Sequence, residues 1–588
     1  MEDPKRISKV IAYAIFVLSG FAFLFFNITG YELAEHGNLV WTWKYTLSVL
    51  GISLTAGGTL GAVLCFLLYR AAANRSHEAD ASREGLLRLK LLRRAPGTGA
   101  LKVFLGSLFL IVLSWLPIYL AYYPAICAYD TFRQTEQIML NSFTDHHPVL
   151  HTLLLKWSME LGEAVFGSIN EGIGFYALVQ LLFLAAAFAL GITFLWQYET
   201  RFLWLVLLQL FCMVYPFHFY MSVSVTKDTI FSAFFVMLVL ALCNILQEQE
   251  YGAAGISAKV LFFCSSVGVI LFRNNGRYAY FILLLFLILM VLFGKGKRRF
   301  FGKLLLWTLG AFIVGNVTLS AIFNVTGAMQ GDRREMLSIP IQQLARTMIY
   351  HGGVGLLPED DGTMVEQDKA LLNEFILNEA YRYYRPDIAD PVKNHTNTYV
   401  VRYRTREFID TYIRLLLKYP GEFINAVLAI DAGYLYPGDV THAFINTPKG
   451  EVTDGGYAQT RWDEVSLNAI GIYKASKWPW LYEKFERWAD ENAYLNLPGI
   501  KYLFVPGIWL YLYLLLLGWL VIRRAYRFCL PLAGVFGYYL TLFLGPTVQL
   551  RYIYPLMITF PFLLLWSVRY VERTGELEVL EQKLRGIE

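Results

Sequence analysis

Residues 102–122 decide the fold class, because they read KVFLGSLFLIVLSWLPIYLAY and contain a single charged residue, Lys102. A helix needs about 20 mostly apolar residues to cross the hydrocarbon core of a bilayer. Windows of this kind recur along the chain, at 9–27, 47–69, 173–195, 202–220, 229–246, 257–272, 278–293, 304–324, 501–521, 528–546 and 553–570. The windows 257–272 and 278–293 are short, and one re-entrant pair is the alternative for them. The sequence therefore predicts an all-α polytopic membrane protein with about 12 transmembrane helices.

The composition agrees with lipid as the surrounding solvent. Of the 588 residues, 56% are hydrophobic and 16% are charged, whereas a soluble domain carries roughly 25% charged residues. The net charge of +5 comes without a long basic tail or an interleaved aromatic and basic patch, so nucleic acid is not an expected partner. The six cysteines form no CxxC pair, which argues against a disulfide framework or a cysteine zinc site.

Basic residues predict the orientation in the membrane, because Lys and Arg concentrate in cytoplasmic loops. Counting spans places four basic clusters on one face: before the first span, and in the links after the second, eighth and tenth spans (Lys5 and Arg6; Arg70 to Arg94; Lys295 to Lys303; Arg523 to Arg527). Both termini are then expected in the cytoplasm. The run 9–26 lacks a clear small-residue cleavage site, so we expect a retained first span rather than a signal peptide.

This topology divides the chain into four parts. They are two N-terminal spans with a basic cytoplasmic link (1–100), a transmembrane core (101–324) with an outer loop (123–172), an extracytoplasmic domain (325–500), and the last spans with a cytoplasmic tail (501–588). The extracytoplasmic segment is long enough for a folded domain. Apolar residues at helical spacing in 366–384 and 396–418 predict that this domain is mainly helical.

The first candidate site lies in the outer loop that follows residues 102–122, where Asp130 and Gln134 occur. A carboxylate at a membrane interface is costly unless it is solvated or paired, which makes Asp130 a candidate functional residue. If the segment is helical, Gln134 shares the face of Asp130 at i+4. The alternative is that Asp130 caps the helix that follows.

A histidine cluster comes next, with His146 and His147 beside Asp145 and with His151 shortly after. Histidine and carboxylate are ordinary zinc ligands, so binding of a divalent metal is one interpretation. Pro148 stands where a zincin HExxH motif would have its general-base glutamate. We therefore favour a role for these histidines in orienting a substrate headgroup. We assign no cofactor, and a divalent metal is the alternative.

Two short outer loops carry further charges. Lys227 and Asp228 follow the fifth span, and Arg273 and Asn275 follow the seventh. Arginine on an outer loop runs against the positive-inside trend and suits bidentate phosphate binding, while Gly276 would let backbone approach a ligand. The alternatives are a mutual ion pair between Lys227 and Asp228 at the headgroup level, and a tight Asn-Gly turn in the second loop.

The remaining candidates follow the ninth span and precede the last one. They are Arg334, Glu335, Gln342, Gln343 and Arg346, together with Arg551 and Tyr552. Pro340 can open a helix, which would place Gln342 and Arg346 on one face; packing within the outer domain is the alternative. With Asp130 and the histidines of the same outer loop counted as one, these residues form five clusters, and all five map to the outer ends of spans. This layout predicts a cavity for an anionic, phosphate-bearing lipid headgroup, with arginines that stabilise a leaving phosphate and with Asp130 as general base.

These motifs resemble those of the GT-C superfamily of membrane glycosyltransferases, in an uncharacterised bacterial branch. The resemblance rests on Asp130 with Gln134, His147 with Pro148, Lys227 with Asp228, Arg273 to Gly276 and Pro340 to Arg346, and it covers roughly residues 102–570. It implies inverting transfer of a sugar from a polyprenyl-phosphate donor to a glycan, lipid or protein acceptor. It also implies a site on the extracytoplasmic face of the bacterial plasma membrane, among membrane lipids. Asp130 lacks the second acidic residue of the mannosyltransferase motif, which leaves metal dependence open.

Two other functions fit parts of the pattern. A polymerase or ligase acting on a lipid-linked glycan would share the topology and the outer arginines, and a pyrophosphate-linked donor would distinguish it. A lipid or glycan transporter would place its polar sites near the bilayer midplane and in repeated halves, whereas the charges here gather at one interface.

Overall fold

The computed structural model describes residues 4–36, 38–78, 98–127, 129–251, 255–294, 297–438, 461–490 and 497–585. Within these ranges the chain is helical, with isolated β-bridges and no strand. The predicted all-α class is confirmed. Most of the basic link expected between the second and third spans falls on residues 79–97, which lie outside the described residues.

Eight helical stretches among the described residues are long and apolar enough to cross a membrane. They are α1 (Pro4–His36), the continuous run of α2 (Trp43–Ile52), η1 (Ser53–Gly57) and α3 (Gly58–Glu78), α5 (Thr98–Ala121), α8 (Ile169–Gln197), α11 (Lys227–Tyr251), α13 (Asn274–Phe293), α14 (Arg298–Thr326) and α25 (Leu550–Arg585). These helices indicate a membrane protein, as the sequence predicts.

The other predicted windows fall on shorter apolar helices. These are the pair α9 (Phe202–Val214) and α10 (Pro216–Val223), α12 (Ile256–Phe272), α23 (Pro506–Ile522) and α24 (Cys529–Leu542). The chain bends by 52° between α9 and α10, where Pro216 occupies the first turn of α10 and cannot continue the hydrogen bonding of α9. Within the part of the chain that the structure describes, length and composition thus support eight spans, or nine if the bent pair is one span. The predicted total of about twelve requires all of these shorter elements to cross as well.

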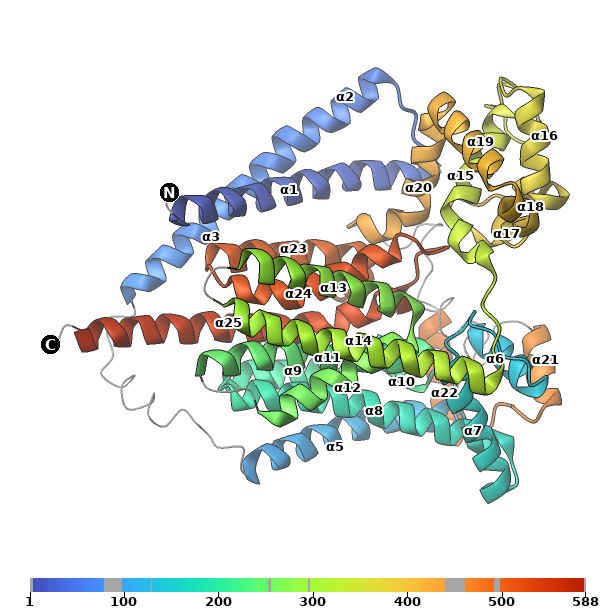
Figure 1. The fold of residues 1–588 in the computed structure, drawn as a ribbon. Helices are drawn as coiled ribbons and strands as arrows, with labels where there is room; N and C mark the ends of the chain where they lie inside the picture. Colours follow the sequence, from blue (N-terminus) through green and yellow to red (C-terminus); the bar gives the residue numbers. More distant parts are fainter. Residues whose placement is uncertain are drawn as a thin grey trace.

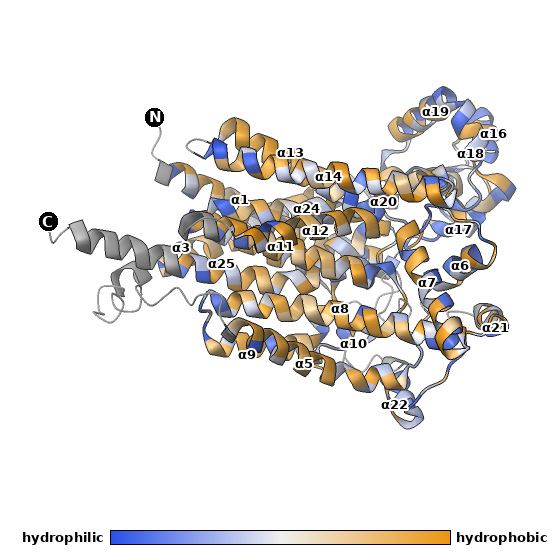
Figure 2. Ribbon diagram, turned by 60° about the horizontal axis from the view of Figure 1, so that its bottom comes forward, coloured by the Kyte–Doolittle hydropathy of each residue, from blue (hydrophilic) through white to orange (hydrophobic). Residues whose placement is uncertain are grey.

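The helices of the bundle lie roughly side by side, and most of the shorter polar helices gather at one end of it (Figure 1). This end holds α6 (Tyr129–Met139), α7 (Val149–Phe166), α15 (Ser338–His351), α16 (Glu366–Phe375), α17 (Asp390–Lys393), α18 (Thr398–Tyr403), α19 (Thr405–Lys418), α20 (Pro420–Leu435), α21 (Arg461–Ala469) and α22 (Pro479–Asp490). Along the chain, η3 (Arg333–Leu337) precedes α15, η4 (Leu377–Tyr383) follows α16 and η7 (Ile500–Phe504) precedes α23. The start of α1 and the end of α25 lie at the opposite end, near η8 (Tyr526–Phe528). Figure 2 shows the same division by hydropathy, with apolar residues dominating the bundle and hydrophilic residues frequent on the gathered helices.

Two apolar cores stabilise these two regions. The larger core fills the bundle around α11, whose spanning window is 94% buried, against 17% for the peripheral α14. The second core lies within residues 341–423 and includes Leu372, Phe375, Leu415 and Phe423. Residues of α21, such as Leu467, belong to the bundle core instead. The segment predicted as one domain, 325–500, therefore contains one helical unit with its own core, and its last helices pack on the bundle.

The N-terminal helices pack through close backbone contacts. A Cβ atom on Gly20 of α1 would lie 2.1 Å from the carbonyl oxygen of Gly57, and one on Gly61 would lie 2.0 Å from that of Phe16. Gly57 and Gly61 form a GxxxG spacing, which lets apolar helices approach closely in a membrane. α1 also contacts α20 and α23, so the N-terminal pair belongs to the same bundle.

Candidate functional site

Three cationic side chains lie at helix N-termini that meet at the polar end of the bundle. Lys227 is the first residue of α11, Arg273 is the N-cap of α13 and Arg551 is the second residue of α25. Asp130, the second residue of α6, contacts two of them directly. We call Asp130, His147, Lys227, Asp228, Arg273 and Arg551 the Asp130 cluster.

Asp130 is the centre of this cluster. Lys227 Nζ donates a hydrogen bond to Asp130 Oδ2, and Arg551 Nη1 lies 3.4 Å from the same oxygen. His147 Nδ1 is 3.8 Å from that oxygen and 3.2 Å from Lys227 Nζ. The structure therefore brings three residues that are far apart in the sequence, His147, Lys227 and Arg551, to one carboxylate.

Asp228 forms the second carboxylate of the cluster. Arg273 Nη1 donates to Asp228 Oδ1, and Arg551 Nε lies 3.8 Å from Asp228 Oδ2. Lys227 pairs with Asp130 while Asp228 pairs with Arg273, so the adjacent residues do not form the mutual pair considered as an alternative. Arg551 connects the two carboxylates.

An aromatic ring separates the two arginines. The Arg273 guanidinium lies 4.6 Å from the centroid of the Tyr552 ring, and that of Arg551 lies 5.2 Å from it. The face of an aromatic ring attracts cations. Tyr552 thus offsets part of the repulsion between Arg273 and Arg551, and Gln549 Oε1 accepts from Arg551 Nε at 2.7 Å.

The cluster is buried and carries excess positive charge. Asp130, Asp228, Arg273 and Arg551 are between 0% and 6% exposed. Three cationic groups face two carboxylates, which leaves one positive charge in excess if His147 is neutral. Buried charges are costly unless paired, and a bound anion would offset this excess.

The electrostatics of the cluster set the protonation states of Asp130 and His147. Burial alone would raise the pKa of Asp130, but Lys227 and then Arg551 outweigh it and hold that pKa well below its usual range. Burial, and then Lys227, lower the pKa of His147 well below its usual range. Asp130 is therefore ionised and His147 neutral at neutral pH, and a firmly ionised carboxylate is a weak base for as long as it stays paired.

Two buried polar atoms beside Asp130 lack a hydrogen-bond partner among the described residues. They are His147 Nε2 and Gln134 Oε1. Because the Lys227 ammonium can only donate, His147 Nδ1 accepts and the neutral ring carries its proton on Nε2. The cluster thus presents one unused donor, and the neighbouring Gln134 presents one unused acceptor, which would suit an anionic oxygen and a hydroxyl of a ligand.

Gln134 also begins a buried hydrogen-bonded chain that the sequence did not predict. Gln134 Nε2 contacts His151 Nδ1 at 2.7 Å, and His151 Nε2 contacts Tyr176 Oη at 2.6 Å. Tyr176 donates to Gln180 Oε1 at 3.1 Å, and Gln180 Nε2 donates to the carbonyl of Ser224 at 2.7 Å. The chain joins α6, α7 and α8 to the segment just before Lys227. Only the short spacing between His147 and His151 hints at it in the sequence.

A second ionic group borders the cluster. Glu335 Oε1 lies 3.8 Å from His146 Nδ1, and Lys393 Nζ lies 2.6 Å from both Glu335 and Asp390. Arg334 donates to the carbonyl of Asn394 at 3.3 Å. Lys393 is only 3% exposed, yet nothing in its sequence context distinguishes it from an ordinary surface lysine.

Four predicted residues are not brought to Asp130. Asn275 donates to the carbonyl of Thr541 at 3.5 Å, Gln342 donates to the carbonyl of Arg385, and Gln343 donates to that of Phe423 at 3.1 Å. Arg346 pairs with Glu422 at 2.7 Å. The last three lie in the helical unit with the second core, which agrees with the alternative of packing within that unit.

Gly276 also differs from its predicted role. α12 and α13 are separated by the single extended residue Arg273, so no separate Asn-Gly turn forms. A Cβ atom on Gly276 would lie 2.3 Å from the carbonyl oxygen of Val269. Its lack of a side chain therefore allows close packing of the two helices and not the approach of a ligand.

The residues of the cluster do not suit a divalent metal. Among the described residues no group of three or more His, Cys, Asp or Glu side chains could hold a metal ion. The histidine closest to Asp130, His147, directs its Nδ1 at the Lys227 ammonium, and three cations would repel a further one.

Sequence comparison relates residues 140–579 to DUF6020, described as a family of unknown function. The chain belongs to this family. The matched region holds His147, Lys227, Asp228, Arg273 and Arg551 and begins after Asp130. No curated protein and no solved structure matches this DUF6020 member.

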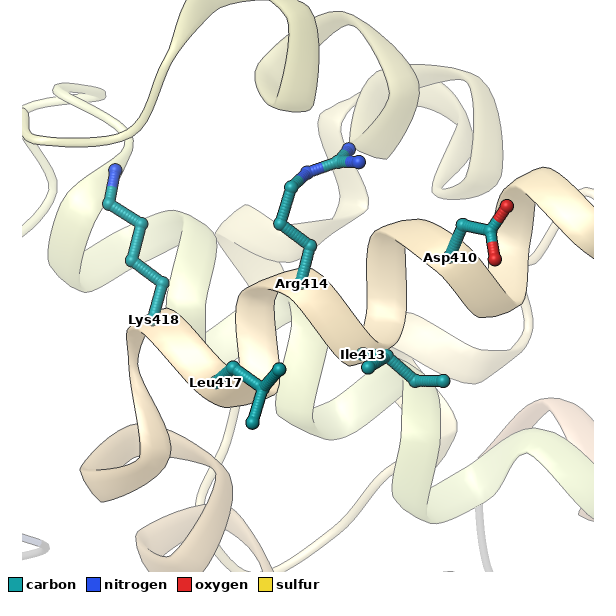
Figure 3. Close-up of a pocket in the computed structure, with 5 residues that line it drawn as sticks. All are labelled: Asp410, Ile413, Arg414, Leu417 and Lys418. Carbon is teal, nitrogen blue, oxygen red and sulfur yellow. The ribbon is translucent and has the colours of Figure 1, made fainter.

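A hollow on α19 carries no comparable chemistry. Its lining residues are Asp410, Ile413, Arg414, Leu417 and Lys418, and Arg414 and Lys418 point away from Ile413 and Leu417 (Figure 3). Arg414 pairs with Asp368, and Lys418 donates to the carbonyl of Thr363 at 2.9 Å. These cations are used within the helical unit, which leaves the Asp130 cluster as the candidate site.

Proposed function

We propose that this DUF6020 member is an inverting glycosyltransferase of the GT-C type. It transfers a sugar from a polyprenyl-phosphate donor to a cell-envelope glycan, lipid or protein. The observation that carries the proposal is the buried Asp130 cluster with its single excess positive charge. A sugar phosphodiester carries one negative charge and balances that excess, whereas a pyrophosphate diester carries two.

The backbone supports an anion at the same place. Lys227, Arg273 and Arg551 lie at the N-termini of α11, α13 and α25. A helix N-terminus carries about half a positive charge and favours bound phosphate. Three such termini beside three cations favour an anionic ligand at the helix ends. A transporter would instead place its polar site near the bilayer midplane.

The transfer proceeds in one displacement. A hydroxyl oxygen of the acceptor forms a bond to the anomeric carbon, while the bond from that carbon to the phosphate oxygen breaks. The bonding electron pair stays on the polyprenyl phosphate, which gains a second negative charge that Lys227 and Arg551 stabilise. The hydroxyl proton passes to Asp130.

Donor binding is what makes Asp130 an effective base. In the structure Lys227 and Arg551 hold its pKa low. When the donor phosphate binds these two cations, their attraction for Asp130 is shared and the carboxylate regains basicity. The unused His147 Nε2 donates to a phosphate oxygen, and Gln134 Oε1 accepts from a sugar or acceptor hydroxyl.

In the membrane, the proposal places the Asp130 cluster and the 325–500 segment on the extracytoplasmic side of the bacterial plasma membrane, with both termini in the cytoplasm and about twelve spans. Contacts at the far end of the bundle support it. Ser8 donates to the carbonyl of Val521 at 2.9 Å, and Arg523 donates to that of Ala72 at 3.4 Å. The start of the chain and the basic α23–α24 link are therefore neighbours, as a shared cytoplasmic face requires.

The decisive experiment replaces the proposed base. Asp130→Asn keeps the size of the side chain and removes its charge, and we expect transfer to fall by at least about 100-fold. The matched control is Glu136→Gln in the same helix, because the Glu136 side chain is exposed and pairs with Arg133 at 3.1 Å. Transfer of labelled sugar from a polyprenyl-phosphate donor is measured with the purified protein in liposomes.

Size-exclusion profiles and thermal unfolding in detergent establish that both variants are folded. Folded Asp130→Asn protein that retains transfer would remove Asp130 from the mechanism. A pyrophosphate-linked glycan used in preference to the monophosphate donor would favour the polymerase or ligase alternative instead.

A further inference from the structure

A narrow cleft of about 220 Å³ opens on the flank of the bundle between α7, α8 and α11. Its outer rim consists of apolar side chains that are partly exposed, namely Trp157 at 52%, Phe175 at 40% and Val179 at 48%. α8 is long and apolar enough to span a membrane, so this flank is expected to face lipid.

The cleft begins one helical turn from the Asp130 cluster. Ile230 lines it and follows Lys227 by three residues on α11, which is a rise of about 4.5 Å along the axis. Residues at i and i+3 share a helix face. On α7, Leu154 of the cleft follows His151 by three residues in the same way. The cleft therefore follows the cluster directly along α11, and along α7 it follows His151, the histidine that contacts Gln134.

The two buried polar side chains in the wall of the cleft, Tyr176 and Gln180, are already paired. Tyr176 Oη contacts His151 Nε2 at 2.6 Å and donates to Gln180 Oε1 at 3.1 Å. The amide nitrogen of Gln180 donates to the carbonyl of Ser224. The wall thus offers mainly apolar surface to an occupant, although it lies beside a charged site.

We infer that this cleft holds the first part of the hydrocarbon chain of the lipid phosphate whose headgroup binds the Asp130 cluster. This inference rests on the proposed function. Only an amphiphile has a phosphate for the cations at Lys227 and an apolar chain for the surface that starts at Ile230. The direction also agrees, because α11 runs from Lys227 into its apolar span.

The cleft affects the orientation of the bound lipid phosphate more than the affinity of the protein for it. Surrounding lipid is as apolar as the cleft, so shape and packing decide which chain occupies it. A chain held there fixes the phosphate next to Lys227 and turns the anomeric carbon toward Asp130. The cleft therefore selects the lipid end of the donor, while the cluster selects its charge.

Photo-crosslinking of the full-length protein in nanodiscs tests the inference. The probe is a polyprenyl phosphate with a diazirine in its first isoprene unit, and labelled peptides are located by mass spectrometry. We expect labelling of α7 and of the first turns of α8. Val179→Trp fills the cleft and is expected to reduce this labelling about tenfold, as an overpacked site would.

The matched control is Leu182→Trp, because Leu182 lies on the same helix, is 39% exposed and lies outside the cleft. Equal labelling of the two variants would overturn the inference, as would labelling confined to other helices. Equal labelling by a polyprenol without phosphate would show nonspecific contact with lipid and would also overturn it.

The crosslink does not depend on catalysis, so the two proposals can fail separately. Labelling of the cleft without transfer in the wild-type protein would contradict the glycosyltransferase alone. Full transfer by Val179→Trp, with labelling elsewhere, would contradict the cleft alone.

Discussion

Arg551 is the residue on which the geometry of the site depends most. Its Nη1 lies 3.4 Å from Asp130 Oδ2, and its Nε lies 3.8 Å from Asp228 Oδ2 and 2.7 Å from Gln549 Oε1. A planar guanidinium presents several donors in a fixed fork, whereas an ammonium is a compact point charge. A lysine could keep the charge but could not bridge both carboxylates.

We therefore predict that Arg551→Gln lowers kcat by about 100- to 1000-fold, as the loss of a donor to the transition state does, and that Arg551→Lys stays well below wild type. Steady-state kinetics in liposomes measure both. Arg277→Lys is the control, because the Arg277 guanidinium lies over the Tyr278 ring at 5.7 Å and has no contact with Asp130 or Asp228. Wild-type kinetics for Arg551→Lys would show that catalysis does not need a guanidinium that contacts both carboxylates.

The sequence predicted which residues matter better than it predicted their partners. Asp130, Lys227, Asp228 and Arg551 were recognisable because charges at the ends of apolar helices are costly. Their pairing was not recognisable, since Lys227 had an adjacent carboxylate in Asp228 but pairs with one 97 residues away. The choice depends on how α6 packs against α11, which no local pattern encodes.

At the scale of helices, hydropathy located the windows but not their ends. Each predicted window falls on an apolar helix or, at 202–220, on the bent pair of α9 and α10, because apolar length is a property of the segment itself. The break between α12 and α13 is a single residue, Arg273, and the sequence suggested a turn there. The packing of α12 against α13 explains why a helix begins there instead of a turn. Gly276 lies close to the carbonyl oxygen of Val269, and this contact between two helices has no local sequence pattern.

Arg346 illustrates a residue that connects elements without belonging to the site. It is fully buried, pairs with Glu422 of α20 at 2.7 Å and donates to Asn38 in the link before α2. Its guanidinium also lies 4.4 Å from the Tyr350 ring centroid. It thus joins the helical unit with the second core to the N-terminal helices.

Arg346→Met is predicted to destabilise the protein by about 3–5 kcal/mol, because it removes the buried partner of Glu422 and leaves that carboxylate with His351, 3.8 Å away. The KM for the donor should remain at the wild-type value in the fraction that stays folded. Thermal unfolding and kinetics in the same liposomes measure the two quantities. Arg382→Met, which removes an exposed arginine paired with Glu379 at 2.6 Å, should change neither. A raised KM for the donor in Arg346→Met would instead indicate that Arg346 takes part in donor binding.

At the scale of the whole molecule, charge is distributed unevenly between the two ends of the bundle. The end with the Asp130 cluster carries buried cations that are paired with carboxylates, and the other end carries the basic α23–α24 link next to the start of α1. In a bilayer, Lys and Arg in short links near the ends of spans favour the cytoplasmic side. Paired and buried cations do not contribute to this preference, because they are fixed within the fold.

Cysteine labelling tests the orientation that follows. Replacing Cys264 and Cys529 by alanine leaves four native cysteines, all buried. Tyr403→Cys then places a thiol on α18, where Tyr403 is 65% exposed, and Tyr526→Cys places one at the opposite end, where Tyr526 is 45% exposed. An impermeant maleimide added to intact cells should label Tyr403→Cys at once and Tyr526→Cys only after permeabilisation. The reverse pattern would place the Asp130 cluster on the cytoplasmic side. This reverse pattern would exclude a donor that binds from the extracytoplasmic side. The Asp130 variants would still test the chemistry of the cluster.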